Sequence, residues 1–193
     1  MINKLACHVT DDMISAISGN NHLGGQDFNE RLFEHVQHDI KRRGVRILKS
    51  EELQSLRQAV EKAKLELTSH KTTLIKLQLG NHKYNYNLSR ETFEKINGDL
   101  FEKVLEPIVT VLASCHLDAS DVDEIVLVGG STRIPKVRQI ITQFFNKELN
   151  TEIDPELAVV SGVSIQAGIL GGMWPLTVSA IELPVTTHKI HLN

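Results

Sequence analysis

The sequence predicts an α/β protein in which helices pack against short β-strands. Helical periodicity recurs along the chain, and two neighbouring segments at 75–79 and 84–88 alternate apolar with polar residues. An apolar segment at 125–128 leads into a glycine pair and a further helical pattern. Strands and helices mixed in this order are typical of α/β layers. The 193 residues are enough for one domain or two small ones with a real core.

The composition is that of an ordinary globular chain. It is 41% hydrophobic and 23% charged, and 21 Lys and Arg against 24 Asp and Glu give a net charge of −3. This near-neutral balance argues against a nucleic-acid binder that works through phosphate charge. No apolar run reaches the ~18 residues of a transmembrane helix, so membrane insertion is not expected. Asp11 and Asp12 interrupt any signal-peptide pattern near Met1.

Residues 1–69 predict one short strand and two helices. Residues 13–17 form the strand, and a turn-rich stretch at 18–29 follows it. The first helix has one apolar face and ends at Gly44. The second starts near Ser50, a residue type favoured at N-caps. Its apolar stripe consists of Leu53, Leu56, Val60, Ala63 and Leu67.

A β-hairpin and two helices are predicted next. The alternating segments at 75–79 and 84–88 are joined by residues 80–83. Ser89 is expected to cap a helix that carries Phe93 and Ile96. A longer apolar helix at 100–112 contains Pro107, which should kink it.

The C-terminal third predicts a strand, two helices and a further strand. Residues 125–128 are expected to form a fully buried strand, and residues 134–145 an amphipathic helix. Asp154, Pro155 and Glu156 suit the N-cap and first turn of another helix, which Gly171 and Gly172 end. Residues 174–183 form a strand-like apolar segment.

A line of polar side chains borders the apolar stripe of the second helix. Arg57, Glu61, Lys64 and Thr68 fall within an arc of roughly 60°, so they can point into a cleft. A glutamate accepts hydrogen bonds from ribose hydroxyls, while a lysine and a hydroxyl donate. Taken alone, the residues favour the alternative, a solvated face with ion pairs between successive turns.

Gly129 and Gly130 lie between the predicted strand and a helix. Glycines let a backbone approach a ligand closely, and a helix N-terminus offers free N–H groups to a phosphate. The segment lacks the lysine of a Walker loop and is not G-x-G-x-x-G, so a tight structural turn is the favoured reading of these residues alone. His35 and His38 have no third ligand nearby, and no metal site through side chains is expected.

Four segments, in order, resemble the Hsp70 family. VLVGGSTRIPK at 126–136 is similar to the family's signature, and HLGGQDF at 22–28 resembles its H-L-G-G-E-D-F segment. LRQAVEKAK at 56–64 resembles its adenosine-contacting helix, and residues 154–167 resemble its N-P-D-E-A-V-A-x-G-A-A-x-Q-A segment. The resemblance implies an actin-like ATPase of the ribonuclease H-like type, with chaperone and stress-response functions.

The resemblance also implies where ATP or ADP binds. Matching the family's motifs residue by residue puts adenosine contacts on Glu61, Lys64, Thr68, Gly130, Ser131 and Arg133, with Gly129 and Glu156 lining the same pocket. The polar line and the glycine pair then serve one nucleotide. Leu65 stands where most members have an arginine that stacks on adenine.

The matched segments correspond to lobe II of the family's ATPase domain. The resemblance implies a partial subdomain IIA at 1–28, subdomain IIB at 29–112, the rest of IIA at 113–183 and a tail at 184–193. The D-L-G-G-G-T loop, the first phosphate loop, the catalytic lysine and the Mg²⁺-organising acids of the family do not occur here. We therefore expect these residues to bind adenosine without hydrolysing ATP, and no catalytic residue is assigned to them.

Partners and location are also implied by the resemblance. Residues 174–184 are similar to the tail of a microsomal member that has no peptide-binding domain, which implies the endoplasmic reticulum lumen; without a signal pattern, the cytoplasm remains open. A nucleotide-exchange factor or a J-domain cochaperone is the implied protein partner. The alternative function is a non-catalytic module that docks exchange factors through subdomain IIB.

Overall fold

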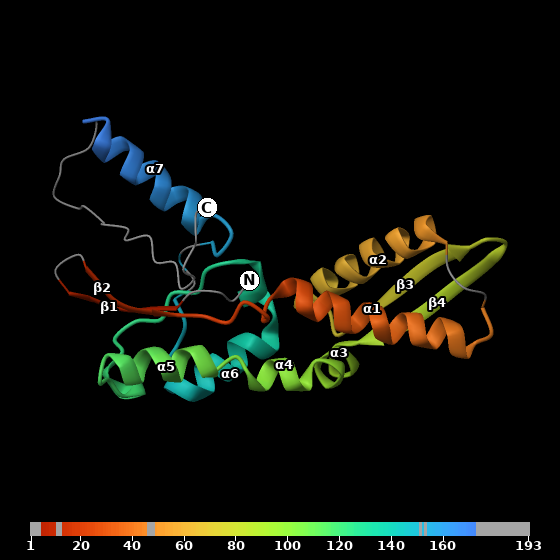
Figure 1. Cartoon of the computed structure of the whole chain (residues 1–193), viewed down its shortest axis with the longest axis horizontal. Coiled ribbons are helices and arrows are strands. Elements are labelled where there is room, and N and C mark those ends of the chain that lie inside the picture. The colour runs from red at the N-terminus through yellow and green to blue at the C-terminus, as the bar shows by residue number, and fades with distance from the viewer. Residues whose placement is uncertain (1–4, 11–12, 46–48, 151, 153, 173–193) are drawn as a thin grey trace, which may run out of the picture.

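The computed structural model describes residues 5–10, 13–45, 49–150, 152 and 154–172 (Figure 1). At one end, helices α1 (Gly25–Arg42) and α2 (Ser50–Ser69) lie beside the hairpin of β3 (Thr72–Leu79) and β4 (His82–Ser89). Helix α7 (Ala158–Leu170) stands at the opposite end, near the hairpin of β1 (Leu5–Thr10) and β2 (Met13–Ser18). The predicted strand at 13–17 is confirmed.

Helices α1 and α2 follow the predicted apolar pattern. The buried face of α1 includes Phe28, Leu32, Val36 and Ile40, and the chain leaves the helix at Gly44 with φ +75°. Four residues of the predicted stripe of α2 are buried: Leu56, Val60, Ala63 and Leu67. Ser50 is the first residue of α2, not its N-cap. The capping residue is Lys49, whose backbone N–H donates to the Glu52 carboxylate at 2.9 Å.

The predicted hairpin is confirmed, with a tighter turn. Strands β3 and β4 pair antiparallel with Ile75 opposite Tyr86 and Leu77 opposite Tyr84. Burial alternates along β3, so one face of the hairpin packs on the helices. Strand β4 begins at His82, which leaves a two-residue loop after Leu79 in which Gly80 has φ +60°.

One buried carboxylate ties α1 to β4. Asp39 Oδ2 accepts hydrogen bonds from the Tyr84 hydroxyl and from Arg43 Nε, each at 2.7 Å, and Oδ1 accepts from Arg42 at 2.8 Å. Burial opposes ionisation of Asp39, but the bond from Tyr84 and the two arginines outweigh it and hold its pKa below the usual range. On the adjacent turn of α1, His35 Nε2 lies 2.8 Å from the Tyr86 hydroxyl.

The helical connection after the hairpin is broken where a kink was predicted. Ser89 caps α3 (Arg90–Ile96) as expected, because its hydroxyl oxygen accepts from Thr92 N at 3.1 Å. Two helices then replace the predicted single one, α4 (Gly98–Glu102) and α5 (Glu106–Ser114). Pro107 lies in the first turn of α5, where its missing N–H leaves no helical hydrogen bond unmade. The proline therefore starts a helix.

The prediction of a fully buried strand at 125–128 was wrong. Val126 makes a single parallel bridge to Asn150, and Val126 and Val128 are 46% and 45% exposed, whereas Ile125 and Leu127 are buried. A parallel strand is buried on both faces only when layers cover both. Among the described residues this segment has cover on one face, so alternate side chains reach solvent.

Short 3₁₀ turns and two helices complete the described chain. They are η1 (Ala119–Asp121), η2 (Gly130–Arg133), α6 (Pro135–Phe145) and α7. Helix α7 begins four residues after Asp154, which instead accepts a bond from Glu156 N and so organises a turn. Gly171 and Gly172 end the helix as predicted. The predicted strand at 174–183 lies outside the described residues, and the proposed division of the chain into four segments remains a prediction.

Candidate functional site

Three segments distant in sequence meet at Gly25, the first residue of α1. Lys64 of α2 donates from Nζ to the Gly25 carbonyl oxygen at 3.2 Å. A Cβ atom at Gly25 would lie 3.2 Å from Lys64 Nζ and 3.3 Å from Ser131 Oγ. These are tight contacts, so a side chain at this position would require the lysine and the serine to shift slightly. Ser131 of η2 (Gly130–Arg133) therefore lies close to the start of α1, where Lys64 of α2 also bonds.

The ammonium of Lys64 is partly withdrawn from water. Burial lowers the pKa of Lys64, and the neighbouring Glu61 carboxylate acts in the opposite direction. A cation in such surroundings interacts more strongly with an oxygen acceptor than one in bulk water. Glu61 is itself exposed beside it.

The glycine pair and the turn at residues 154–156, before α7, form the second half of the site. Gly129 has φ +90° and donates from its N–H to the Pro155 carbonyl at 2.7 Å. A Cβ atom at Gly130 would lie 3.2 Å from Glu156 Oε1. The Arg133 guanidinium pairs with the Asp154 carboxylate at 2.8 Å and with Glu156 Oε2 at 3.2 Å. Two carboxylates therefore fix the orientation of the guanidinium group.

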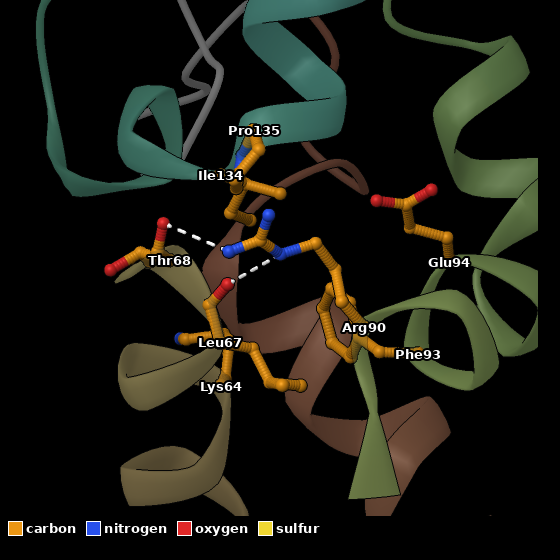
Figure 2. Close-up of a pocket in the computed structure, with 8 residues that line it drawn as sticks. All are labelled: Lys64, Leu67, Thr68, Arg90, Phe93, Glu94, Ile134 and Pro135. Atoms are coloured by element: carbon orange, nitrogen blue, oxygen red, sulfur yellow. Dashed lines mark hydrogen bonds between the residues drawn. The ribbon is translucent and has the colours of Figure 1, made fainter. Parts of the chain in front are cut away.

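A narrow pocket connects α2 with the start of α6 (Figure 2). Its volume is about 10 Å³, close to that of one water probe, so it is too small to enclose a purine. Its lining residues are Lys64, Leu67, Thr68, Arg90, Phe93, Glu94, Ile134 and Pro135. A ring could therefore rest only at the mouth of this pocket.

Arg90 is the residue here that sequence reasoning missed. Its Nε donates to the Leu67 carbonyl, and its Nη2 donates to the His70 carbonyl, each at 2.9 Å. Figure 2 shows its guanidinium reaching the end of α2 from α3. These bonds satisfy carbonyls that the end of a helix leaves unpaired. No sequence motif marks an arginine that caps a neighbouring helix; its place directly after the capping Ser89 is the one available signal.

The structure brings six of the eight predicted residues into two adjoining groups. Lys64 and Ser131 meet at Gly25, and Gly129, Gly130, Arg133 and Glu156 meet at the glycine turn. Thr68 lines the narrow pocket, but its hydroxyl donates to the Leu65 carbonyl of its own helix at 2.7 Å. Glu61 stays at the surface. Leu65 is 56% exposed.

Arg57 does not belong to the site. Its guanidinium pairs with Glu30 of α1 at 2.6 Å and lies 4.3 Å from the centroid of the Phe33 ring. Arg57 therefore belongs to an exposed ion pair, as the alternative prediction had it. The pair joins α2 to α1, whereas the prediction had placed both partners on one helix.

The acids of the described residues do not offer a place for Mg²⁺. No group of three His, Cys, Asp or Glu side chains in the described ranges lies close enough to hold a metal ion. The two acids nearest the glycine turn, Asp154 and Glu156, are already paired with Arg133. Mg²⁺ prefers several oxygen ligands, so these residues do not by themselves fit it.

Comparison with known families identifies the chain. The family described as "Hsp70 protein" matches residues 12–187, a span that includes every residue of the two groups above. The chain belongs to the Hsp70 family. Its fold is accordingly that of the Hsp70 ATPase domain, an actin-like α/β fold.

Individual Hsp70 relatives agree with this assignment. The chain is 42% identical to Heat shock 70 kDa protein 13 (Stch) of Bos taurus, Mus musculus and Homo sapiens, over 215 aligned positions. The alignments cover 88% of this chain and 46% of each relative, so the chain spans about half the length of these relatives. In the part of the chain that the structure describes, no helix is long and apolar enough to cross a membrane.

Proposed function

We propose that the two groups of residues around Gly25 and the glycine turn form the adenosine-binding half of an Hsp70-type nucleotide site. The observation that carries the proposal is the meeting of Lys64 and Ser131 at Gly25, because it joins the family's adenosine helix to its signature loop. A ligand that replaces the Gly25 carbonyl as the acceptor for Lys64 would contact α1, α2 and η2 together. Adenosine has ribose oxygens and ring nitrogens that can accept from these donors.

Seven of the eight predicted residues have a chemical task in this proposal, Thr68 being the exception because its hydroxyl donates to the Leu65 carbonyl. Lys64 and Ser131 donate hydrogen bonds, and exposed Glu61 accepts from ribose hydroxyls. Gly129 and Gly130 let the base approach the backbone closely. Arg133, held by Asp154 and Glu156, offers its guanidinium plane to the ring. Leu65 offers aliphatic contact where a stacking arginine is usual, so we expect weaker affinity for adenine.

We further propose that these residues alone do not hydrolyse ATP. Phosphoryl transfer depends on metal ions and fixed donors around the transferred phosphate. The described acids do not fit Mg²⁺, and the sequence contains none of the family's phosphate loops. Hydrolysis of ATP to ADP with Mg²⁺, a chaperone function and a place in the endoplasmic reticulum lumen are proposals for the whole protein.

Calorimetric titration with adenosine, ADP and ATP, with and without Mg²⁺, tests the proposal. We expect adenosine and ADP to bind with similar affinity and without Mg²⁺ dependence. Lys64→Ala should weaken binding at least tenfold, and so should Gly130→Val, whose side chain would meet Glu156. Lys62→Ala is the matched control, since Lys62 is an exposed lysine on the same helix.

Two results would overturn this assignment. Absence of saturable binding to the folded chain would show that the half-site is not competent. Equal loss in Lys62→Ala and Lys64→Ala would show that general positive charge, and not this geometry, attracts the nucleotide.

The second candidate function is docking of a nucleotide-exchange factor through residues 29–112. The observation that favours it is that the β3–β4 hairpin and α2 both bury one face in the core, so that the other face of β3 is exposed on a packed support. Pull-down of an Hsp70 exchange factor by the full chain tests it. Retention by the chain but not by a variant altered at exposed Leu74 and Lys76 of β3 would support docking; no retention at all would exclude it.

A further inference from the structure

A second cleft lies on the other side of the wall that closes the narrow pocket. It is formed by α3, α4 and the start of α5 on one side and by α6 on the other, which run near each other in Figure 1. Its volume is about 570 Å³, within the range of sites that hold small organic molecules. None of the residues proposed to contact adenosine lines it.

The floor of this cleft is apolar and comes from two elements. Phe101 and Leu105 lie on the α4–α5 side, and Ile140 and Phe144 are one turn apart on α6. Phe101 is buried, while the other three are partly exposed toward the cleft. An aromatic or aliphatic body placed here would remove apolar surface from water on both sides.

The rim of the cleft is acidic. Glu94 and Glu102 line it, and within the described part of the chain neither carboxylate has a cationic partner within ion-pair distance. Lys136 is the one basic residue of the lining, and its ammonium lies 3.4 Å from the Gln139 side-chain oxygen. Two acids against one base leave an excess of negative charge over an apolar floor.

We propose that this cleft binds a small organic cation with an apolar body. The ammonium group would lie near the Glu94 and Glu102 carboxylates, where the apolar floor strengthens the attraction relative to open water. The ring would pack on Ile140 and on Phe144, whose face can also attract a cation. An anion of the same shape is disfavoured by the same two carboxylates.

The cleft and the narrow pocket share a wall. Glu94 lines both, and the consecutive residues Pro135 and Lys136 line one each. Occupation of the cleft should therefore also perturb the start of α6, on the face that Ile134 turns toward α2. Binding in the cleft can therefore also be detected from changes at the start of α6.

Titration of the full chain with 4-phenylbutylamine, followed by backbone amide NMR shifts, tests the proposal. Two molecules of nearly the same shape isolate the charge: neutral 4-phenylbutan-1-ol and anionic 4-phenylbutyrate. We expect saturable shifts at Phe101, Ile140 and Phe144 with the amine, with affinity falling at least fivefold for the alcohol and further for the acid.

Variants of the rim test the assigned charges in both directions. The double variant Glu94→Gln and Glu102→Gln should weaken amine binding at least fivefold, whereas Glu91→Gln, an exposed acid on α3 outside the lining, should not change it. Lys136→Gln should tighten amine binding about twofold, a gain that misfolding cannot produce. Equal binding of amine, alcohol and acid, or no saturable shift at these residues, would overturn the proposal.

Discussion

The segment from Leu23 to Ile108 has a lower share of apolar residues than the segment from Val126 to Leu170, yet it buries more of them. The largest fully buried side chains all lie in the first segment. Among the described residues, twelve large hydrophobic side chains are exposed; eight lie in the second segment, six of them on α7 or directly before it. Helix α6 adds Val137, Ile141 and Phe145 to the same core as the first segment, whereas α7 adds no side chain to it. The exposed apolar surface of the second segment is therefore concentrated on α7.

Truncation of a core residue is the largest expected effect and tests this difference directly. Phe28→Ala should lower the free energy of unfolding by about 3–5 kcal/mol, because Phe28 is fully buried and its ring lies 4.9 Å from that of Phe101. Val163→Ala on α7 should change it by no more than about 0.5 kcal/mol. Urea denaturation measures both; similar losses would mean that the two segments are equally packed.

Removal of the Asp39 carboxylate should have the next largest effect. Asp39→Ala leaves the Tyr84 hydroxyl and two arginines without their acceptor, at a cost of about 2–3 kcal/mol. Asp99→Ala, which breaks an exposed pair with Arg31, should cost less than about 1 kcal/mol. Because the pKa of Asp39 is lowered in the native state, its contribution is complete above about pH 4. It is lost as pH falls through the native pKa, which thermal unfolding across that range would show.

A smaller, pH-dependent effect is expected at His35. Burial lowers the pKa of this imidazole, so the unfolded state binds a proton before the native state does as pH falls. Stability should therefore decline from about pH 6.5 downward and level off below the native pKa. His35→Gln should remove this part of the pH profile, while His38→Gln, at an exposed position, should leave it. If the dependence of stability on pH is unchanged in His35→Gln, another titrating group causes it.

The smallest effect on stability is expected on the outer face of α7. Val159→Ser with Val163→Ser should change the free energy of unfolding by less than about 1 kcal/mol and reduce concentration-dependent light scattering. The same pair of changes at buried Val36 and Val60 should unfold the chain. Unchanged scattering would show that this apolar face does not drive association.

Periodicity in the sequence was sufficient where each segment buries its own apolar face. This holds for the stripe of α2 and for the alternation at Ile75, Leu77 and Leu79. The cap at Ser89 was predicted from its residue type, because its hydroxyl can accept a bond from the first turn of the helix. The segment at 125–128 was misjudged because its burial depends on neighbours that periodicity does not reveal. Within the site, neither the glycine pair nor the polar line of α2 alone predicted a nucleotide site. Only the family resemblance, which includes both, did so. The contact at Gly25 depends on three segments that share no local pattern.

The bonds that Arg90 makes to the end of α2 have a consequence for how the molecule opens. Helix ends commonly fray on their own, and their amide protons then exchange quickly with solvent. Here the guanidinium holds the Leu67 and His70 carbonyls, and the Arg90 backbone N–H also donates to the Lys71 carbonyl at 2.8 Å. The last turn of α2, which carries Thr68, should therefore exchange its protons in step with the hairpin strand before Arg90, as one cooperative unit.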